Sequence, residues 1–366
     1  MTITSGALRT RTELCTAVES ELTTQIDRKA GAAAAYGPDF ARLWTLAGKN
    51  VLGGKFVRPL LLMETYDALQ QGAAQPGFVA RRETAITIAG AIELLHYAFL
   101  LHDDVIDGDL VRRGHPNLIG SLLEEAGELP RPDGALHWAQ TGGILMGDLL
   151  LSGTHQTFAR AELPHELRLR LLDLLEHTID ETVAGEQLDV GLGDGIVAPE
   201  LGTILMMCGY KTATYTFELP LRAAAALAGA SAAVENSLAR AGRHLGLAFQ
   251  LQDDLLSTFG DPGQHGKDPF SDLREGKQTA IIAHARMTNA WQDIEPFFGR
   301  PELHATEAEH VRRKLADCGA QQFVQALIDE QMMAFTHLLT SFASPIPPAA
   351  RNVLLELAAQ LEGRQS

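Results

Sequence analysis

The sequence predicts an all-α fold, and three observations support that prediction. Alanine, leucine, glutamate, glutamine and arginine dominate, while runs of β-branched residues are rare, a balance that favours helix over strand. Apolar residues recur at helical spacing in one segment after another. No linker or shift in composition divides the chain. We therefore expect a single helical domain over residues 1–366, although the length alone would allow two. Residues 1–12 are expected to form a disordered tail.

The expected helices are separated by breaks rich in glycine and proline. An amphipathic helix over 13–28 ends in a Gly/Ala stretch, and helical spacing resumes over 40–46 until Gly53 and Gly54 interrupt it. Pro59 should begin the next helix, because its missing N–H is not needed in a first turn. Further helices are expected over 83–106, 141–158, 167–185, 201–229 and 234–258, and again beyond residue 276. Pro220 should kink or break the helix over 201–229.

The segment 83–106 is apolar nearly all round, and three carboxylates stand at its end or just beyond it, Asp103, Asp104 and Asp107. It should form a central, buried helix of roughly 36 Å. Asp103 and Asp107 stand one turn apart on one face, where two like charges repel. Packing explains such a group poorly. Mg2+ explains it better, since this ion prefers carboxylates together with waters and substrate phosphates.

A second acidic pair, Asp253 and Asp254, lies near the end of the expected helix over 234–258. Taken alone, each acidic motif is also compatible with a solvated helix end. Two such motifs, each near the end of a long apolar helix and each followed by cations that can bind phosphate, predict instead carboxylates facing one another across one cavity. The cations are Arg112, Arg113, Lys267 and Lys277.

Other polar residues stand at positions that plain packing does not require. Lys55 and Arg58 lie in the glycine-bordered turn GGKFVRP before a helix, where cations and backbone N–H groups suit a diphosphate; a solvated turn is the alternative. Lys211 and Thr212 lie mid-helix in an apolar setting, which also fits a snorkelling lysine. His96 stands two turns before the first acidic motif, where a hydrogen-bonded core histidine is the alternative.

Composition narrows the classes of function. The net charge of −16 argues against nucleic-acid binding. The three cysteines are odd in number and far apart, so they form neither a metal site nor a disulfide framework, and we expect a cytoplasmic protein. The N-terminus lacks the apolar core of a signal peptide. Polar residues break the most apolar windows, so no transmembrane helix is expected. We find no convincing nucleophile triad.

Seven motifs follow one another along roughly residues 50–290: GGKFVRP, ELLHYAFLLHDDVIDGDLVRRGHP, GDLLLS, GEQLD, YKTATYTFELP, FQLQDD and GKDPFSDLREGK. In this order they resemble the motifs of the trans-isoprenyl diphosphate synthases, the polyprenyl synthetase family that includes farnesyl and geranylgeranyl diphosphate synthases. The resemblance implies an all-α bundle around a deep central cavity, a dependence on Mg2+ and a homodimer.

The same resemblance implies roles by position. Isopentenyl diphosphate would be held by Lys55, Arg58, His96 and Arg113. Two Mg2+ bridging the allylic diphosphate would be bound by Asp103 and Asp107, with Asp104 in support. The same diphosphate would contact Arg112, Lys211 and Lys267, with Lys277 of the closing loop as a further candidate contact. A third Mg2+ would be bound by Asp253 with help from Asp254. Oxygens near the developing allylic cation would come from Thr212 and Gln250.

The chemistry of head-to-tail prenyl transfer agrees with these roles. An allylic C–O bond breaks and leaves pyrophosphate and a carbocation, so metal ions and cationic side chains must stabilise the leaving charge. The site must also exclude water, which would trap the cation. The double bond of isopentenyl diphosphate then attacks, and a proton is lost to form the new allylic diphosphate.

Product length is expected to depend on the side chains below Asp103. Ala98, five residues earlier, lies about 7.5 Å down the helix axis and leaves room where shorter-product enzymes often carry an aromatic residue. Phe99 could still act as a floor. We therefore predict the twenty-carbon product, geranylgeranyl diphosphate, with the fifteen-carbon farnesyl diphosphate as the alternative.

One position departs from the family pattern. Ser257 stands where the second motif commonly has its last aspartate, and a hydroxyl is a poorer Mg2+ ligand, so we expect a modest loss of metal affinity. Two other functions stay open. A class I terpene cyclase should lack an isopentenyl diphosphate site and usually carries an Asn/Ser/Glu triad. A non-catalytic partner subunit should have lost site residues, of which Ser257 is the one hint.

Overall fold

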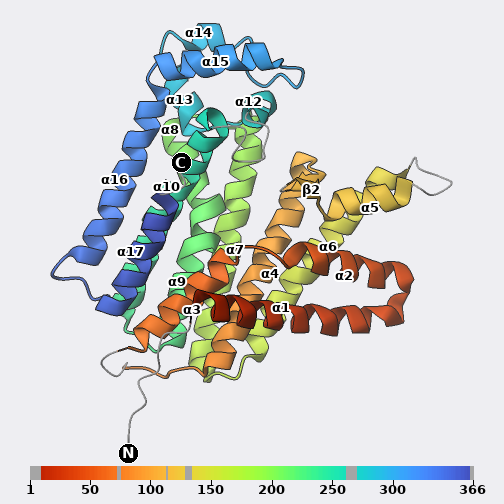
Figure 1. The fold of residues 1–366 in the computed structure, drawn as a ribbon, viewed down its shortest axis with the longest axis vertical. Coiled ribbons are helices and arrows are strands. Elements are labelled where there is room, and N and C mark those ends of the chain that lie inside the picture. Colours follow the sequence, from red (N-terminus) through yellow and green to blue (C-terminus); the bar gives the residue numbers. More distant parts are fainter. Residues whose placement is uncertain (1–9, 72–75, 113, 128–133, 261–269, 363–366) are drawn as a thin grey trace, which may run out of the picture. The chain divides into compact units, whose positions relative to one another are not determined.

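The structure is a computed structural model that describes residues 10–71, 76–112, 114–127, 134–260 and 270–362. These residues are helical almost throughout (Figure 1). In this part of the chain the strands are confined to one antiparallel hairpin, β1 Val111–Arg112 and β2 His115–Pro116. The all-α prediction is confirmed.

The chain forms two compact units. The first unit is Met1–Leu175 with Pro220–Glu235, and the second is Glu176–Leu219 with Asn236–Ser366. The chain passes from one unit to the other inside helices α7 and α10 and at the start of α9. This division reports which residues pack together and does not test whether the chain is one domain. A single domain over residues 1–366 therefore remains a prediction.

The first unit is built from helices that surround α4. Its elements are α1 (Arg11–Ala33), the 3-10 turn η1 (Ala34–Tyr36), α2 (Pro38–Val51), α3 (Val57–Leu69), α4 (Arg82–Asp107), α5 (Leu118–Gly127), α6 (Ala135–Arg160), the first part of α7 (His165–Gly193), most of α9 (Leu219–Leu227) and the start of α10 (Ala232–Phe259).

Helix α1 begins earlier than the sequence suggested. The Thr10 hydroxyl accepts a hydrogen bond from the N–H of Glu13, and the Glu13 carboxylate accepts one from the N–H of Thr10 at 2.8 Å. This capping box fixes the first turn at residue 11. The predicted disordered tail over 1–12 is therefore wrong for residues 11 and 12, and residues 1–9 lie outside the described part of the chain.

Helix α4 confirms the prediction of a long buried helix over 83–106. It runs beside α6 (Figure 1), where a Cβ at Gly143 would lie 3.0 Å from Val105 of α4. Glycines on α6 therefore allow the two helices to approach closely. Among the described helices, α4 is the one long and apolar enough to cross a membrane, and 72% of its most apolar window is buried. A core helix passes the same test, so the absence of a transmembrane helix remains a prediction.

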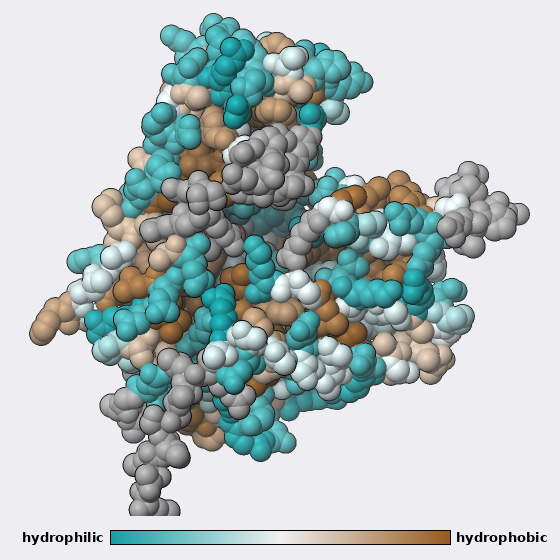
Figure 2. Space-filling view, in the orientation of Figure 1, coloured by the Kyte–Doolittle hydropathy of each residue, from teal (hydrophilic) through white to brown (hydrophobic). Residues whose placement is uncertain are grey.

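The second unit holds the remaining helices around its own apolar core. Its elements are the rest of α7, α8 (Leu201–Cys208), the π-helix η3 (Gly209–Glu218), most of α10, α12 (Ser271–Glu275), α13 (Ala280–Arg286), α14 (Trp291–Ile294), α15 (Ala305–Asp317), α16 (Ala320–Thr340) and α17 (Pro348–Glu362). Fully buried residues such as Leu251, Ile281, Val311 and Val324 join α10, α13, α15 and α16. The surface over α14 and α15 is largely hydrophilic (Figure 2).

The helical segment predicted over 201–229 changes its type ahead of Pro220, where the predicted kink or break would lie. The chain is α-helical over α8, π-helical over Gly209–Glu218, and α-helical again over α9. The N–H of Leu219 donates to the carbonyl of Thr214, five residues earlier, which is the bond that defines a π-helix. Such turns are rare, usually short, and frequent at functional sites.

Candidate active site

The first acidic motif lies at the carboxyl end of α4, where a glycine ends the helix. Gly108 has the left-handed φ of 74°, and its N–H donates to the carbonyl of Asp104, the αL cap that glycine favours. Asp103 is half-buried, Asp104 is buried and Asp107 is exposed. Asp103 and Asp107 are four residues apart, so they lie on one side of α4 as predicted, while Asp104 turns inward.

The turn after Gly108 brings Arg112 back onto the end of α4. The Arg112 guanidinium donates to Asp104 Oδ1 from Nη2 at 2.5 Å and from Nε at 3.1 Å, and to Asp103 Oδ2 at 3.3 Å. Asn117 holds the far side of the turn, since its Nδ2 donates to the carbonyl of Asp109 at 2.8 Å. Arg112 is thus fixed beside two carboxylates, where it reduces their repulsion.

Burial is the largest influence on the pKa values of the groups around Asp104. Burial raises the pKa of the Asp104 carboxyl, and the bond from Arg112 offsets only part of that shift. Burial also opposes the charge on Arg112, yet its two carboxylate partners leave the Arg112 pKa raised. The Tyr97 phenol lies in the same field, and burial followed by the charge of Asp104 raises its pKa. Asp103 and Asp107 are the two carboxylates of this motif that keep exposed surface.

The turn before α3, which carries Lys55 and Arg58, has a strained backbone at Phe56. Phe56 has φ 48°, and among the described residues it is the one non-glycine residue with a positive φ. A bulky residue in this region costs energy and persists only where the surroundings enforce it, often at a functional site. Phe56 is 4% exposed, so its buried ring can supply that enforcement. Lys55 on one side is exposed, and Arg58 on the other is half-buried at the start of α3.

The inner turns of α4 carry the remaining predicted residues of this unit. His96 is half-buried, two turns before the acidic motif. Ala98 has no exposed surface and Phe99 is half-buried. Phe99, rather than Ala98, is therefore the side chain at this depth that still presents a surface. The roles of all three in substrate binding or product length remain predictions.

The second acidic motif lies near the end of α10 and repeats the pattern of the first. Asp253 is exposed and Asp254 is buried. The Gln250 amide donates from Nε2 to Asp254 Oδ1 at 2.9 Å, and its Oε1 accepts from the Thr212 hydroxyl at 2.8 Å. The structure thus joins three predicted site residues in one chain of hydrogen bonds, from the π-helix to the acidic pair.

Lys211 is fixed by two carboxylates of α7. Its Nζ lies 2.7 Å from Asp189 Oδ2 and 2.9 Å from Glu186 Oε2. These two acids stand three residues apart on α7, which places them on one face. The setting is an ion-pair cluster on the helix side, rather than the purely apolar surroundings that the sequence suggested.

Lys277 enters the same neighbourhood from the segment after α12. Burial would lower its pKa, but the charges of Asp272, Asp254 and Asp189 outweigh that effect and leave the pKa raised. Burial raises the pKa of Asp254 to about 7, against the opposing charge of Lys277. Lys277 and Asp254 are therefore electrostatic partners, a relation that the predicted contact between Lys277 and a diphosphate did not include.

The exposed carboxylates fit Mg2+, although the described side chains do not form a complete metal site. No group of three His, Cys, Asp or Glu residues in the described ranges is assembled to hold an ion. Mg2+ needs no such group, because it is usually bound through one or two carboxylates, with waters and substrate phosphates completing its shell. Asp103 with Asp107, and Asp253 alone, present carboxylates of that kind. Asp254, predicted as a ligand, has one carboxylate oxygen engaged by Gln250 and is buried.

Two predicted residues, Arg113 and Lys267, lie outside the residues that the structure describes. No role was predicted for five residues that the structure brings into these contacts, Glu186, Asp189, Glu181, Glu218 and Arg243. A signal for the first two was available in the motif GEQLD, whose acids have helical i, i+3 spacing. No comparable signal marks the other three, whose contacts depend on the π-helix.

A family model described as polyprenyl synthetase matches residues 41–315. The chain belongs to the polyprenyl synthetase family. The resemblance drawn from the ordered motifs is thereby confirmed, and so is the reading of the chain as an enzyme, a trans-prenyltransferase.

Named relatives agree with this assignment. The chain is 30% identical over 277 residues to the geranylgeranyl diphosphate synthase of Methanosarcina mazei, covering 75% of this chain and 76% of that one. It is 30% identical over 321 residues to the (2E,6E)-farnesyl diphosphate synthase of Mycobacterium tuberculosis, covering 86% and 80%. A crystal structure of the geranylgeranyl pyrophosphate synthase of Corynebacterium glutamicum, complexed with isoprenyl diphosphate and magnesium, is 26% identical, with a TM-score of 0.86 over 96% of this chain and 99% of that one.

Proposed function

We propose that this polyprenyl synthetase condenses isopentenyl diphosphate with an allylic diphosphate and releases geranylgeranyl diphosphate. The observation that carries the proposal is the shared design of the two acidic motifs. In each, a carboxylate with exposed surface precedes a buried one that a neighbouring side chain holds. Relatives named for geranylgeranyl diphosphate support the product length.

In this proposal the exposed carboxylates hold the metal. Asp103 and Asp107 on α4 and Asp253 on α10 would bind Mg2+, up to three ions with substrate present, and the bound ions would neutralise charge on the leaving diphosphate. The buried partners act on these carboxylates indirectly. Asp104 fixes Arg112, and Asp254 fixes Gln250, so that a guanidinium and an amide are held in place before substrate arrives.

The cations divide between the two substrates. Isopentenyl diphosphate would be bound by Lys55, Arg58, His96 and Arg113. The allylic diphosphate would be bound by Arg112, Lys211 and Lys267, with Lys277 as a further contact. Thr212 and Gln250 would turn oxygens toward the developing cation. Strain at Phe56 supports the first group, because a strained turn that fixes two cations is typical of a binding site.

We further propose a homodimer in the cytoplasm. The three cysteines are free, which agrees with a reducing compartment. Farnesyl diphosphate remains the second candidate product, because the half-buried ring of Phe99 offers a floor and a farnesyl diphosphate synthase is among the relatives.

The test is incubation of purified protein with Mg2+, isopentenyl diphosphate and, in turn, the five-, ten- and fifteen-carbon allylic diphosphates, with products measured by mass spectrometry. We expect a twenty-carbon diphosphate that is absent when EDTA replaces Mg2+. A fifteen-carbon end product would identify farnesyl diphosphate as the product instead. No elongation from any starter would refute the proposal and favour a cyclase or a partner subunit.

A further inference from the structure

The π-helix Gly209–Glu218 carries Lys211 and Thr212, yet nothing in the predicted chemistry explains why it keeps this geometry. A π-helix has a wider turn than an α-helix, and runs of ten residues are unusual because such segments are mostly single-turn bulges. Contacts with neighbouring elements must therefore stabilise it. A cluster of charged and polar side chains contacts the middle and the C-terminal end of the π-helix, at Thr214 and Glu218.

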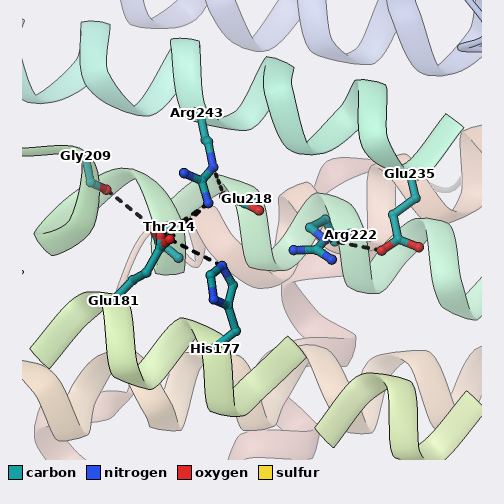
Figure 3. Close-up of polar contacts among 8 residues, drawn as sticks. All are labelled: His177, Glu181, Gly209, Thr214, Glu218, Arg222, Glu235 and Arg243. Carbon is teal, nitrogen blue, oxygen red and sulfur yellow. Dashed lines mark hydrogen bonds and ion pairs between the residues drawn. The ribbon is translucent and has the colours of Figure 1, made fainter. Parts of the chain in front are cut away.

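The cluster joins the π-helix to α7 and to α10, and Figure 3 shows its members pointing toward one another. Glu181 of α7 accepts from the Thr214 hydroxyl at 2.7 Å. Arg243 of α10 lies 3.2 Å from Glu181 Oε1 through Nη2, and its Nε donates to Glu218 Oε2 at 2.5 Å. His177, one turn before Glu181, lies 3.4 Å from the same carboxylate.

The burial of Glu218 argues against a role of this cluster in stability alone. The side chain of Glu218 is 3% exposed, while that of Arg243 is 48% exposed. Burying a carboxylate is costly, and an apolar pair of similar shape is often as stable or more so. Buried ionic groups are best explained where they fix one register among several. The π-helix, whose turn must be kept from relaxing to an α-turn, is such a case.

The contacts are spaced so that one register satisfies them all. Helix α7 holds the π-helix at two points, Glu181 to Thr214 and Asp189 to Lys211. Helix α10 also holds it at two points, Arg243 to Glu218 and Gln250 to Thr212. A slip of one residue would rotate the side chains of the π-helix and break at least one contact on each side.

Three glycines add steric constraint. A Cβ at Gly185 of α7 would lie 2.8 Å from the Cα of Lys211, and one at Gly242 of α10 would lie 2.9 Å from the Cα of Glu218. At Gly246 a Cβ would lie 2.5 Å from the Cα of Ala213. Both helices therefore approach the backbone of the π-helix closely, and the charged cluster acts on a segment that is already tightly packed.

We propose that Glu181, Arg243 and Glu218 are positioning residues that fix the register of the π-helix, and thereby the direction in which Lys211 and Thr212 face the allylic diphosphate. The inference rests on the roles proposed above for Lys211 and Thr212. None of the three positioning residues needs to touch substrate.

The chain offers a control that does not involve the π-helix. Arg222 of α9 contacts buried Glu235 of α10 at 3.2 Å, a contact that Figure 3 also draws, and Glu235 pairs in addition with Arg170 of α7. Arg243→Met and Arg222→Met each remove a guanidinium from a buried glutamate, but only the first acts on the π-helix. Arg243→Lys keeps a cation near Glu218, and Glu218→Gln keeps the shape of the side chain without its charge, in case Arg243→Met fails to fold.

The experiment measures turnover, the KM of each substrate, and hydrogen exchange of peptides covering 209–218, for these variants at a temperature where all are folded. For Arg243→Met we expect kcat to fall about 100-fold, the cost of misplacing a group by roughly 1 Å, with the KM of isopentenyl diphosphate unchanged and faster exchange in the π-helix. Arg243→Lys should lose less than about tenfold, and Arg222→Met less than about twofold.

Equal losses of turnover in Arg243→Met and Arg222→Met, or wild-type exchange over 209–218 in the first, would overturn the register proposal. Lys211→Ala and Thr212→Ala test the roles on which it rests. Wild-type turnover in both would refute those roles, while hydrogen exchange would still decide whether the cluster fixes the π-helix.

Discussion

Gly185 gives the sharpest test of the packing around the π-helix, because a single methyl group decides it. A Cβ added there would lie 2.3 Å from the backbone nitrogen of Lys211, and 2.8 Å from both the Cα of Lys211 and the carbonyl carbon of Tyr210. Carbon atoms prefer about 3.5 Å, so the two backbones must separate by more than half an ångström. Gly153 of α6 is the control, since a Cβ there meets nothing within 4 Å.

Alanine is favoured over glycine inside a helix by about 1 kcal/mol, so Gly153→Ala should raise the free energy of unfolding by that amount. Gly185→Ala gains the same term but loses about 1–3 kcal/mol to overpacking. The facing atoms are backbone and cannot rotate away, so we expect the upper end and a net loss of about 2 kcal/mol.

The assay is urea denaturation at 25 °C, followed by circular dichroism, with turnover measured on the same samples. Gly185→Ala should also lower kcat, because the strain falls on the backbone of Lys211. A Gly185→Ala protein as stable as Gly153→Ala, with unchanged turnover, would show that the close approach of α7 to the π-helix has no energetic weight.

Three further changes test other parts of the site. Arg112→Met should cost about 3 kcal/mol at pH 7, since it strips a buried carboxylate of its partner. Burial raises the pKa of Asp104 and Arg112 lowers it, so the folded variant should take up the Asp104 proton at a higher pH than the wild type, and the deficit should shrink as the pH falls. Urea titrations that give a deficit independent of pH would contradict this. Ser257→Asp should lower the Mg2+ concentration for half-maximal rate by about tenfold, or 1.4 kcal/mol. An unchanged Mg2+ dependence would show that the Ser257 hydroxyl does not limit metal affinity. Phe99→Ala should lengthen the product measured by mass spectrometry, whereas an identical product distribution would show that the ring is core packing.

Periodicity predicted the parts of the site that lie on straight helices. It placed Asp103 and Asp107 on one side of α4 and put the second acidic pair near the end of another long helix. It did not predict that Asp104 and Asp254 turn inward. The return of Arg112 to Asp104 is set by the turn after Gly108, about which single-helix spacing contains no information. Gln250 and Asp254 are four residues apart on α10, so helix spacing allows their contact, but it does not tell which side of the helix other elements cover.

The π-helix shows a different limit. The composition of the residues GYKTATYTFE does not separate them from an ordinary helix, so the pattern predicts a continuous α-helix through them. The wider turn is explained instead by contacts with other parts of the chain. These are the close approach at the glycines of α7 and α10, and the cluster around Arg243. Tertiary structure here overrides local propensity, which is also why the carboxylate partners of Lys211 were missed.

The return of Arg112 to Asp104 has a consequence for folding kinetics. The contact joins residues only eight apart in sequence, and closing so short a loop costs little chain entropy and takes well under a microsecond. The carboxylates of α4 can thus acquire their cation as soon as the helix end forms, without waiting for distant parts of the chain. Contacts such as Arg243 with Glu181, 62 residues apart, must form later. The first acidic motif should therefore be among the earliest native structure, and the register of the π-helix among the last.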